Sequence, residues 1–249
     1  MVGVFDGAYI KQGTFSSATE IAKLMDCAAM SYPNVAYCVT GSSPNGLSSV
    51  GRVLGVRASR NIAASIGNVS LGSVATEEYF TDSDLASVSS NPKTGTPVNG
   101  YDVTLANLIA PLGYIFTRNR LGVEGLYYND GATCNATTMA LNKIERVAVG
   151  NSVCDDAQMF LTYYINQNIP CDSSGQILQA FKNSAIAEFT SQYINPRVNA
   201  GQASAIDFDF KAKDDNYIQS EALEVTIRIV PNPAMREAFV TTFFVTSIS

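Results

Sequence analysis

The stretch Gly113–Asn166 constrains the fold of this chain more than any other part of the sequence. Apolar residues 114–116 predict a short strand, a glycine-bracketed turn follows, and residues 126–128 predict a second strand. A helix of about two dozen residues is expected after that strand. Because side chains alternate along a strand, Tyr127 and Tyr128 should point to opposite faces, one buried and one exposed. The stretch therefore predicts a strand–turn–strand–helix unit around which the rest of the chain packs.

The first hundred residues predict alternating helices and strands. Ser17 and Glu20 form a capping box, in which each side chain satisfies a backbone amide at the start of a helix. We then expect, in chain order, a buried strand at Val35–Thr40, a helix reaching about Ile66, a strand at Val69–Ala75 and an exposed loop at residues 81–99. Residues 1–100 are therefore expected to form the first part of an α/β core.

Residues 101–249 predict the second part of the same continuous domain, with the long helix and the C-terminal strands. A second capping box, Ser173 with Gln176, should start another helix, which Pro196 should end. Alternating apolar and polar residues predict three strands, at Ile206–Phe210, Leu223–Ile229 and Glu237–Ser247. The fold expected for the whole chain is α/β or α+β, a mixed sheet flanked by helices with a C-terminal antiparallel meander.

The composition argues against two classes of partner. The net charge is −6, and non-specific nucleic-acid binding depends on Lys and Arg that neutralise phosphates. No apolar run approaches the ~20 residues that span a bilayer, and the first residues do not resemble a signal peptide. We therefore expect neither a nucleic-acid nor a membrane partner.

Charged residues are scarce and unevenly placed. They make up 15% of the chain, against about a quarter in an ordinary globular protein. A surface this poor in charge suits a protein packed against copies of itself, although a low-charge monomer fits the composition equally well. Arg52, Arg57 and Arg60 lie in a stretch without acids, whereas Asp207–Glu224 holds six acids and two lysines. These two patches could meet across a subunit contact, or each could be a solvated face.

Residues suited to catalysis are few. The chain has no histidine, which excludes a Ser-His-Asp triad, and its five cysteines include no CxxC pair that would indicate zinc. We expect reduced, mostly buried thiols, no cofactor and no catalytic site. One alternative is a metal-dependent α/β enzyme in which Asp207 and Asp209, on one face of a strand, hold a hard cation. The competing interpretation makes both aspartates the solvated face of that strand.

Several motifs occur in an order that resembles a known family. They are GYIF followed by an arginine, GVEGLYYND, IERVAVGNSV and IPCDSSGQI, with EALEVTIRIVPNPAMREAFVTTFFV near the end. The order resembles the core of tail-sheath proteins of contractile phages and related injection machines, over roughly residues 100–247. The positions that carry the resemblance are Gly113, Tyr114, Arg118, Gly122, Gly125, Tyr128, Asn129, Asp130, Ile144, Arg146, Pro170, Asp172 and Gly175.

The resemblance implies a function in assembly. Sheath subunits stack into a helical tube around an inner tail tube protein and contract to drive it through an envelope. Neighbours are linked by extended arms that add strands to another subunit's sheet. The chain is short for the family, so we expect it to lack an N-terminal arm. The resemblance also implies a virion tail protein, made in the bacterial cytoplasm.

Strand lending would place the C-terminal residues at a contact between copies. The candidate self-assembly residues are Phe239, Thr241, Phe243 and Val245 in the last predicted strand, with Arg57 and Arg60 from the basic patch. A second alternative to the sheath is another phage structural component, in the capsid or the baseplate.

Overall fold

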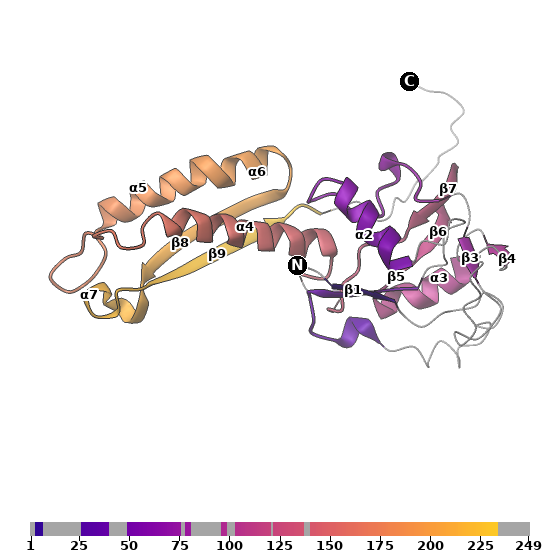
Figure 1. The fold of residues 1–249 in the computed structure, drawn as a ribbon, viewed down its shortest axis with the longest axis horizontal. Coiled ribbons are helices and arrows are strands. Elements are labelled where there is room, and N and C mark those ends of the chain that lie inside the picture. The colour runs from indigo at the N-terminus through magenta and orange to yellow at the C-terminus, as the bar shows by residue number, and fades with distance from the viewer. Residues whose placement is uncertain are drawn as a thin grey trace, which may run out of the picture.

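The computed structural model describes residues 3–6, 26–39, 49–75, 78–80, 96–98, 103–120, 122–136 and 140–233. Figure 1 shows two lobes, a compact lobe built by β1 to β7 with α2 and α3, and an elongated lobe built by α4 to α7 with β8 and β9. The helix predicted after Ser17, residues 81–95 of the loop predicted at 81–99 and the strand predicted at Glu237–Ser247 lie outside the described residues. Residues 96–98 of that predicted loop form a short strand instead. The division of the chain at residue 100 stays a prediction.

A small parallel sheet forms the centre of the compact lobe. Its strands are β1 (Gly3–Asp6), β2 (Val35–Cys38) and β5 (Tyr114–Ile115), with β2 in the middle. Parallel strands need crossover connections, and these leave helices on the sheet faces. The helices are α2 (Ser49–Ser59) and α3 (Val103–Ile109), which a 3₁₀ turn extends through Ala110–Leu112. The sequence prediction of a buried strand beginning at Val35 is confirmed.

Alternation along β5 and the residue after it, Phe116, divides their side chains between two cores. Tyr114 and Phe116 join a cluster with Ile109 of α3, whereas Ile115 joins a cluster with Val53 of α2. The sheet therefore lies between the two helices, with one apolar core on each side.

Two antiparallel hairpins complete the compact lobe. They pair β3 (Glu78–Phe80) with β4 (Thr96–Val98), and β6 (Thr117–Arg120) with β7 (Val123–Tyr128). The expectation that Tyr127 and Tyr128 would differ in burial is wrong, because both are buried. Tyr128 lies in the core under α2, while the hydroxyl of Tyr127 donates to the carbonyl of Glu124. Both faces of the end of β7 are thus covered, so alternation does not expose either ring.

The segment after α2 differs from the prediction. The helix ends at Ser59 instead of near Ile66, and Val69–Leu71 is a 3₁₀ turn instead of a strand. The side chain of Asn68 accepts from the amide of Ser70 at 3.0 Å, which bends the backbone into that turn. Only Ala75 bridges to a strand, at Leu126 of β7.

Two long helices, two short ones and a two-stranded sheet make the elongated lobe. The helices are α4 (Ile144–Thr162) and α5 (Gln179–Phe189), and α5 continues through a π-helical turn at Thr190–Ile194 into α6 (Asn195–Asn199). The strands β8 (Ala203–Ala212) and β9 (Leu223–Pro231) are antiparallel, joined by a 3₁₀ turn at Lys213–Asp215 and the short α7 (Tyr217–Ser220).

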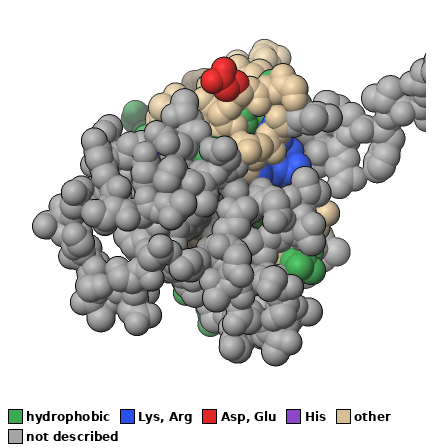
Figure 2. Space-filling view, turned by 90° about the vertical axis from the view of Figure 1, so that its right-hand side faces the viewer, with side chains coloured by type: hydrophobic (Ala, Val, Ile, Leu, Met, Phe, Trp, Pro, Cys, Tyr) green, Lys and Arg blue, Asp and Glu red, His purple; other side chains and the backbone are tan. Residues whose placement is uncertain are grey.

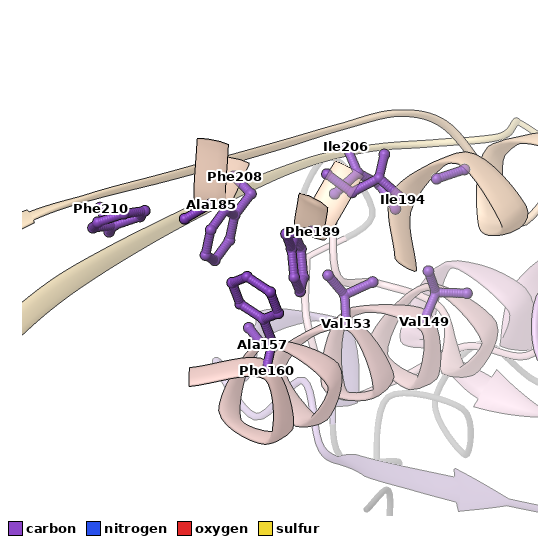
Figure 3. Packing of buried hydrophobic residues seen from close by; sticks show 11 residues of the cluster. Val149, Val153, Ala157, Phe160, Ala185, Phe189, Ile194, Ile206, Phe208 and Phe210 are labelled. Carbon is purple, nitrogen blue, oxygen red and sulfur yellow. The ribbon is translucent and has the colours of Figure 1, made fainter. Parts of the chain in front are cut away.

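An aromatic core holds these layers together (Figure 3). Phe189 of α5 stacks on Phe208 of β8 with ring centroids 4.1 Å apart, and Phe160 of α4 meets Phe189 at 5.3 Å. Along α4, Val149, Val153, Ala157 and Phe160 recur at helical spacing and are all buried. On β8, Ile206, Phe208 and Phe210 face this core, as the alternation of the sequence predicts.

Two helix boundaries of the elongated lobe were predicted wrongly. Asp172 replaces Ser173 as the local cap, since its carboxylate accepts from the amides of Ser174 and Gln176, and α5 begins only at Gln179. Pro196 does not end the helix, because it stands in the first turn of α6, directly after the π-helical turn. The wider π turn carries the helix past a residue that has no amide hydrogen.

The fold class is confirmed, a mixture of helices and sheets with a C-terminal antiparallel hairpin. The strands are divided among small separate sheets instead of one mixed sheet. All five cysteines are free thiols, as expected, and Cys27, Cys38 and Cys134 are buried.

Candidate assembly site

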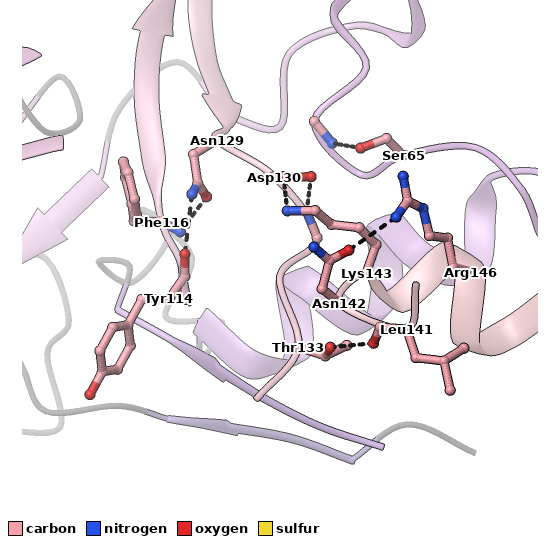
Figure 4. A network of polar contacts seen from close by, with 12 residues as sticks. Ser65, Tyr114, Phe116, Asn129, Asp130, Thr133, Leu141, Asn142, Lys143 and Arg146 are labelled. Carbon is pink, nitrogen blue, oxygen red and sulfur yellow. Dashed lines mark hydrogen bonds and ion pairs between the residues drawn. The ribbon is translucent and has the colours of Figure 1, made fainter. Parts of the chain in front are cut away.

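Asn129, one of the positions that carry the family resemblance, links two strands of the compact lobe. Its side-chain amide donates to the carbonyl of Tyr114 at 3.1 Å and accepts from the amide of Phe116 at 2.9 Å (Figure 4). Its own backbone amide donates to the carbonyl of Phe116 at 2.8 Å. One asparagine therefore supplies the hydrogen bonds that join β5 to the end of β7. Arg120 adds a bond from its guanidinium to the Asn129 carbonyl at 3.2 Å.

A charged network ties the same segment to the start of α4. Lys143 forms an ion pair with Asp130, whose other carboxylate oxygen accepts from the amide of Gly131 at 2.8 Å. Arg146 donates to the side chain of Asn142 at 3.2 Å (Figure 4). Burial is the main cause that raises the pKa of Glu145, although Lys143 and neighbouring arginines oppose the rise. The Asp130–Lys143 pair thus ties the segment after β7 to the start of α4, and Arg146 bonds the residues just before that helix.

The turn at Asp172 and Gly175 packs against α7 at the other end of the molecule. Gly175 has φ +82°, and a β-carbon there would collide with the side chain of Asn216. The amide of Tyr217 donates to the Gly175 carbonyl at 2.8 Å, so the turn lies directly on α7. Hydrogen bonds from Ser174 and Gln176 lower the pKa of Asp172. Only glycine combines this backbone conformation with so close an approach.

The sheet of the elongated lobe is a candidate assembly site because it has two edges. Within the described residues, β8 and β9 pair only with each other. One face of the pair packs on the helices, and the other is solvated, with exposed Glu224, Thr226 and Arg228 on β9. Such an edge offers backbone amides and carbonyls to a further strand.

Asp207 and Asp209 do not gather into a metal site. Asp207 forms an ion pair with Arg228 at 2.8 Å, and Asp209 forms one with Lys182 of α5 at 2.7 Å. The hydrogen bond from Lys182 is the main cause that lowers the pKa of Asp209. Among the residues described, no group of three or more Asp, Glu, Cys or His side chains is arranged to hold a metal ion. Both aspartates belong to the polar face of β8, as the competing interpretation predicts.

The arginines of the predicted interface lie at the end of α2, half-buried. Arg57 donates to the carbonyls of Asn61 at 3.0 Å and Ile62 at 2.5 Å, and Arg60 donates to the Ser65 carbonyl at 3.0 Å. They thus fold the loop after α2 onto the helix end. The other predicted interface residues, Phe239, Thr241, Phe243 and Val245, lie outside the described part of the chain. The assignment of all six to an interface stays a prediction.

An exposed apolar end of the elongated lobe was missed at the sequence level. We call it the distal tip and define it as residues 163–178 and 213–221, which lie together at the left in Figure 1. Tyr163, Ile165 and Ile218 are its most exposed apolar side chains. The signal available was the presence of large apolar residues in segments that otherwise read as polar loops.

Comparisons with known proteins agree at the level of the fold. No protein-family model matches the sequence, and no curated protein matches it significantly. In the part of the chain that the structure describes, no helix is both long and apolar enough to cross a membrane. The structure matches a chain of the PVC sheath complex in its contracted state, solved by cryo-EM from an extracellular contractile injection system. The TM-score is 0.59 at 13% identity, and the match covers 98% of this chain and 64% of that chain. The fold of this chain is therefore sheath-like.

Proposed function

We propose that this protein is a structural subunit of a contractile sheath, which assembles with copies of itself into a helical tube around an inner tube and contracts during envelope penetration. The observation that carries the proposal is the fold match along almost the whole chain to a sheath complex of an injection system. A phage or prophage tail and a related injection machine are both compatible with this function.

The β8–β9 sheet supports a specific joint between copies. A two-stranded sheet that is packed on helices over one face gains backbone hydrogen bonds when another strand is added at its edge. We infer that residues 239–249 of one copy supply such a strand to the next copy, with Phe239, Thr241, Phe243 and Val245 in it. This joint is heterologous, and it propagates into an open filament when the rotation between copies does not close a ring.

Imaging of the purified protein tests this function. Negative-stain microscopy of the full chain should show tubes with a regular helical pitch, whereas rings, shells or plates would favour a baseplate or capsid component. Removal of Phe239–Ser249 should abolish the tubes. Circular dichroism of the shortened protein is the control, because its folded signal should be retained. Tubes that form equally well after the deletion would contradict strand lending.

A further inference from the structure

Two cysteines from distant parts of the chain meet in one core of the compact lobe. Cys27 lies in the 3₁₀ turn Cys27–Ala29, and Cys134 follows β7. Both are 0% exposed, and both belong to the apolar cluster that contains Tyr114. The thiol of Cys134 and the hydroxyl of Tyr114 each form a hydrogen bond with the sulfur of Cys27. The two sulfurs are therefore in contact, and the structure holds both as free thiols.

The backbone on both sides fixes this contact. The amide of Tyr32 donates to the carbonyl of Cys134 at 2.7 Å, and the amide of Cys134 donates to the carbonyl of the first residue of β2, also at 2.7 Å. The turn that holds Cys27 is packed closely from another side. Gly113 has φ +81°, and a β-carbon there would lie 3.0 Å from the amide nitrogen of Ala28. The fold thus holds the two cysteine-bearing segments against each other through backbone bonds and close packing.

The two thiols differ in how readily they lose a proton. The hydrogen bond from Cys134 is the main cause that lowers the pKa of Cys27; burial opposes this change, and the hydrogen bond from Tyr114 adds to it. The pKa of Cys134 is raised, chiefly because its thiol donates to Cys27 and also because it is buried. Because the thiolate is the form that attacks an oxidant, Cys27 is the attacking sulfur of the pair and Cys134 the resolving one.

We propose that Cys27 and Cys134 form an oxidation site, at which a peroxide converts the two thiols into a disulfide inside the compact lobe. The sulfur of Cys27 attacks one oxygen of hydrogen peroxide and breaks the O–O bond, which gives a sulfenic acid and one molecule of water. The sulfur of Cys134 then attacks the sulfenic sulfur, and the hydroxyl group leaves with the proton of Cys134 as a second water. Two thiols lose two electrons, and one peroxide gains them.

The oxidant reaches the pair through a local opening of the chain. In Figure 2, which looks onto the compact-lobe end of the molecule, the described apolar side chains, cysteines included, show only as small separate patches. The turn that covers Cys27 is three residues long, and Asp26 and Ala29 beside it are exposed. Short surface segments open at a low cost in free energy. We therefore expect Cys27 to react, but more slowly than exposed Cys154.

The disulfide would close a loop of about a hundred residues, between positions 27 and 134. A cross-link over a loop of this length restricts mainly the unfolded chain, and it therefore stabilises the folded one. We expect peroxide to raise the melting temperature by about 5–15 °C and a reductant to reverse the change. The site lies within a single copy of the chain, so this inference does not depend on the proposed assembly.

Peptide mapping of the oxidised full chain tests the site. Cys154 and Cys171 are first replaced by serine, which leaves the three buried thiols. The folded protein is treated with hydrogen peroxide, unfolded in iodoacetamide to block free thiols, digested, and analysed by mass spectrometry without reduction. The expected product is a disulfide between Cys27 and Cys134. Cys38 is the internal control, because it is 1% exposed but lies in the other core, beside α2, and should be recovered alkylated.

Two single variants separate the roles of the sulfurs. In Cys134→Ala the reaction should stop at the sulfenic acid of Cys27, which dimedone labels. In Cys27→Ala the labelling of Cys134 should be at least about fivefold lower, because its thiol holds its proton more tightly. Neither variant should gain thermal stability in peroxide. Circular dichroism checks that both variants fold, and the peptide map of the two-serine protein decides the question without them.

Two results would overturn the oxidation site. One is the absence of the 27–134 disulfide at a peroxide dose that fully oxidises Cys154 in the parent protein. The other is a disulfide of Cys38 at equal yield, which would show that the thiols pair only after the chain unfolds. Equal dimedone labelling in the two alanine variants would overturn the assignment of Cys27 as the attacking sulfur. The presence or absence of tubes tests only the assembly function and leaves this inference unchanged.

Discussion

At the scale of single residues, Gly175 fixes a tight turn and the buried Glu145 makes stability depend on pH. Gly175→Ala should destabilise the fold by about 1–3 kcal/mol, because alanine resists a φ of +82° and its β-carbon would strike Asn216. The matched control is Gly150→Ala in the middle of α4, where an added β-carbon meets nothing within 4 Å. This control should stabilise by about 0.5–1 kcal/mol. Urea unfolding of both variants gives the comparison, and equal effects would contradict this account of Gly175.

The buried carboxyl of Glu145 should make stability depend on pH. Its pKa is raised in the folded state by burial, so its contribution is favourable below the pKa of the unfolded chain and is lost as pH rises through the folded pKa. Glu145→Gln should therefore stabilise the protein at pH 8 relative to pH 5, compared with the parent. The pH dependence due to Asp209 has the opposite sign. Lys182 lowers the pKa of this half-exposed carboxyl, so its smaller contribution to stability is lost as the pH falls. Melting temperatures between pH 4 and 8 measure this; parallel curves for parent and Glu145→Gln would refute it.

At the scale of elements, Arg197 joins α6 to α4. Its guanidinium donates to Asp156 at 2.7 Å and to the hydroxyl of Ser152 at 2.7 Å, and both charged side chains are largely buried. Arg197→Lys should cost about 1–3 kcal/mol, because an ammonium cannot reproduce the forked geometry. The control is Arg228→Lys, whose pair with Asp207 is exposed and should change stability by less than about 0.5 kcal/mol. Thermal unfolding compares them, and equal losses would show that burial of the Arg197 pair is immaterial.

Elements were predictable where burial follows a simple period. The alternation of Ile206, Phe208 and Phe210 gave the correct strand and the correct buried face, because one side of β8 packs on helices and the other meets water. The strand predicted at Val69–Ala75 failed because the Asn68 side chain competes for the backbone, a local bond that apolar periodicity does not report. Pro196 was wrongly predicted to end the helix because it stands in the first turn of α6, after a π-helical turn that residue types do not indicate.

The candidate site was predictable only in part. The resemblance singled out Asn129, Asp130 and Gly175, and the structure gives them architectural tasks that residue types alone did not indicate. The distal tip was missed because its two segments, far apart in the sequence, meet only in the fold, where the amide of Tyr217 donates to the carbonyl of Gly175.

At the scale of the whole molecule, we expect a single unfolding transition. Ile144, at the start of α4, is buried in the compact-lobe core, and Val149–Phe160 of the same helix contribute to the core of the elongated lobe. Phe208→Ala should cost about 3–5 kcal/mol and shift the entire transition to lower temperature. Scanning calorimetry measures it, with Leu108→Ala on the exposed side of α3 as a nearly neutral control. Two separate heat-absorption peaks would mean that the lobes unfold independently.

The course of α4 has a mechanical consequence. A helix of 19 residues is a stiff rod about 28 Å long, anchored in one apolar core at its start and in another along its remaining length. Because α4 is one continuous helix, a torque applied beyond its far end meets no flexible segment along the helix. We therefore expect such a torque to reach the Asp130–Lys143 ion pair at the start of α4 and to turn the two lobes together.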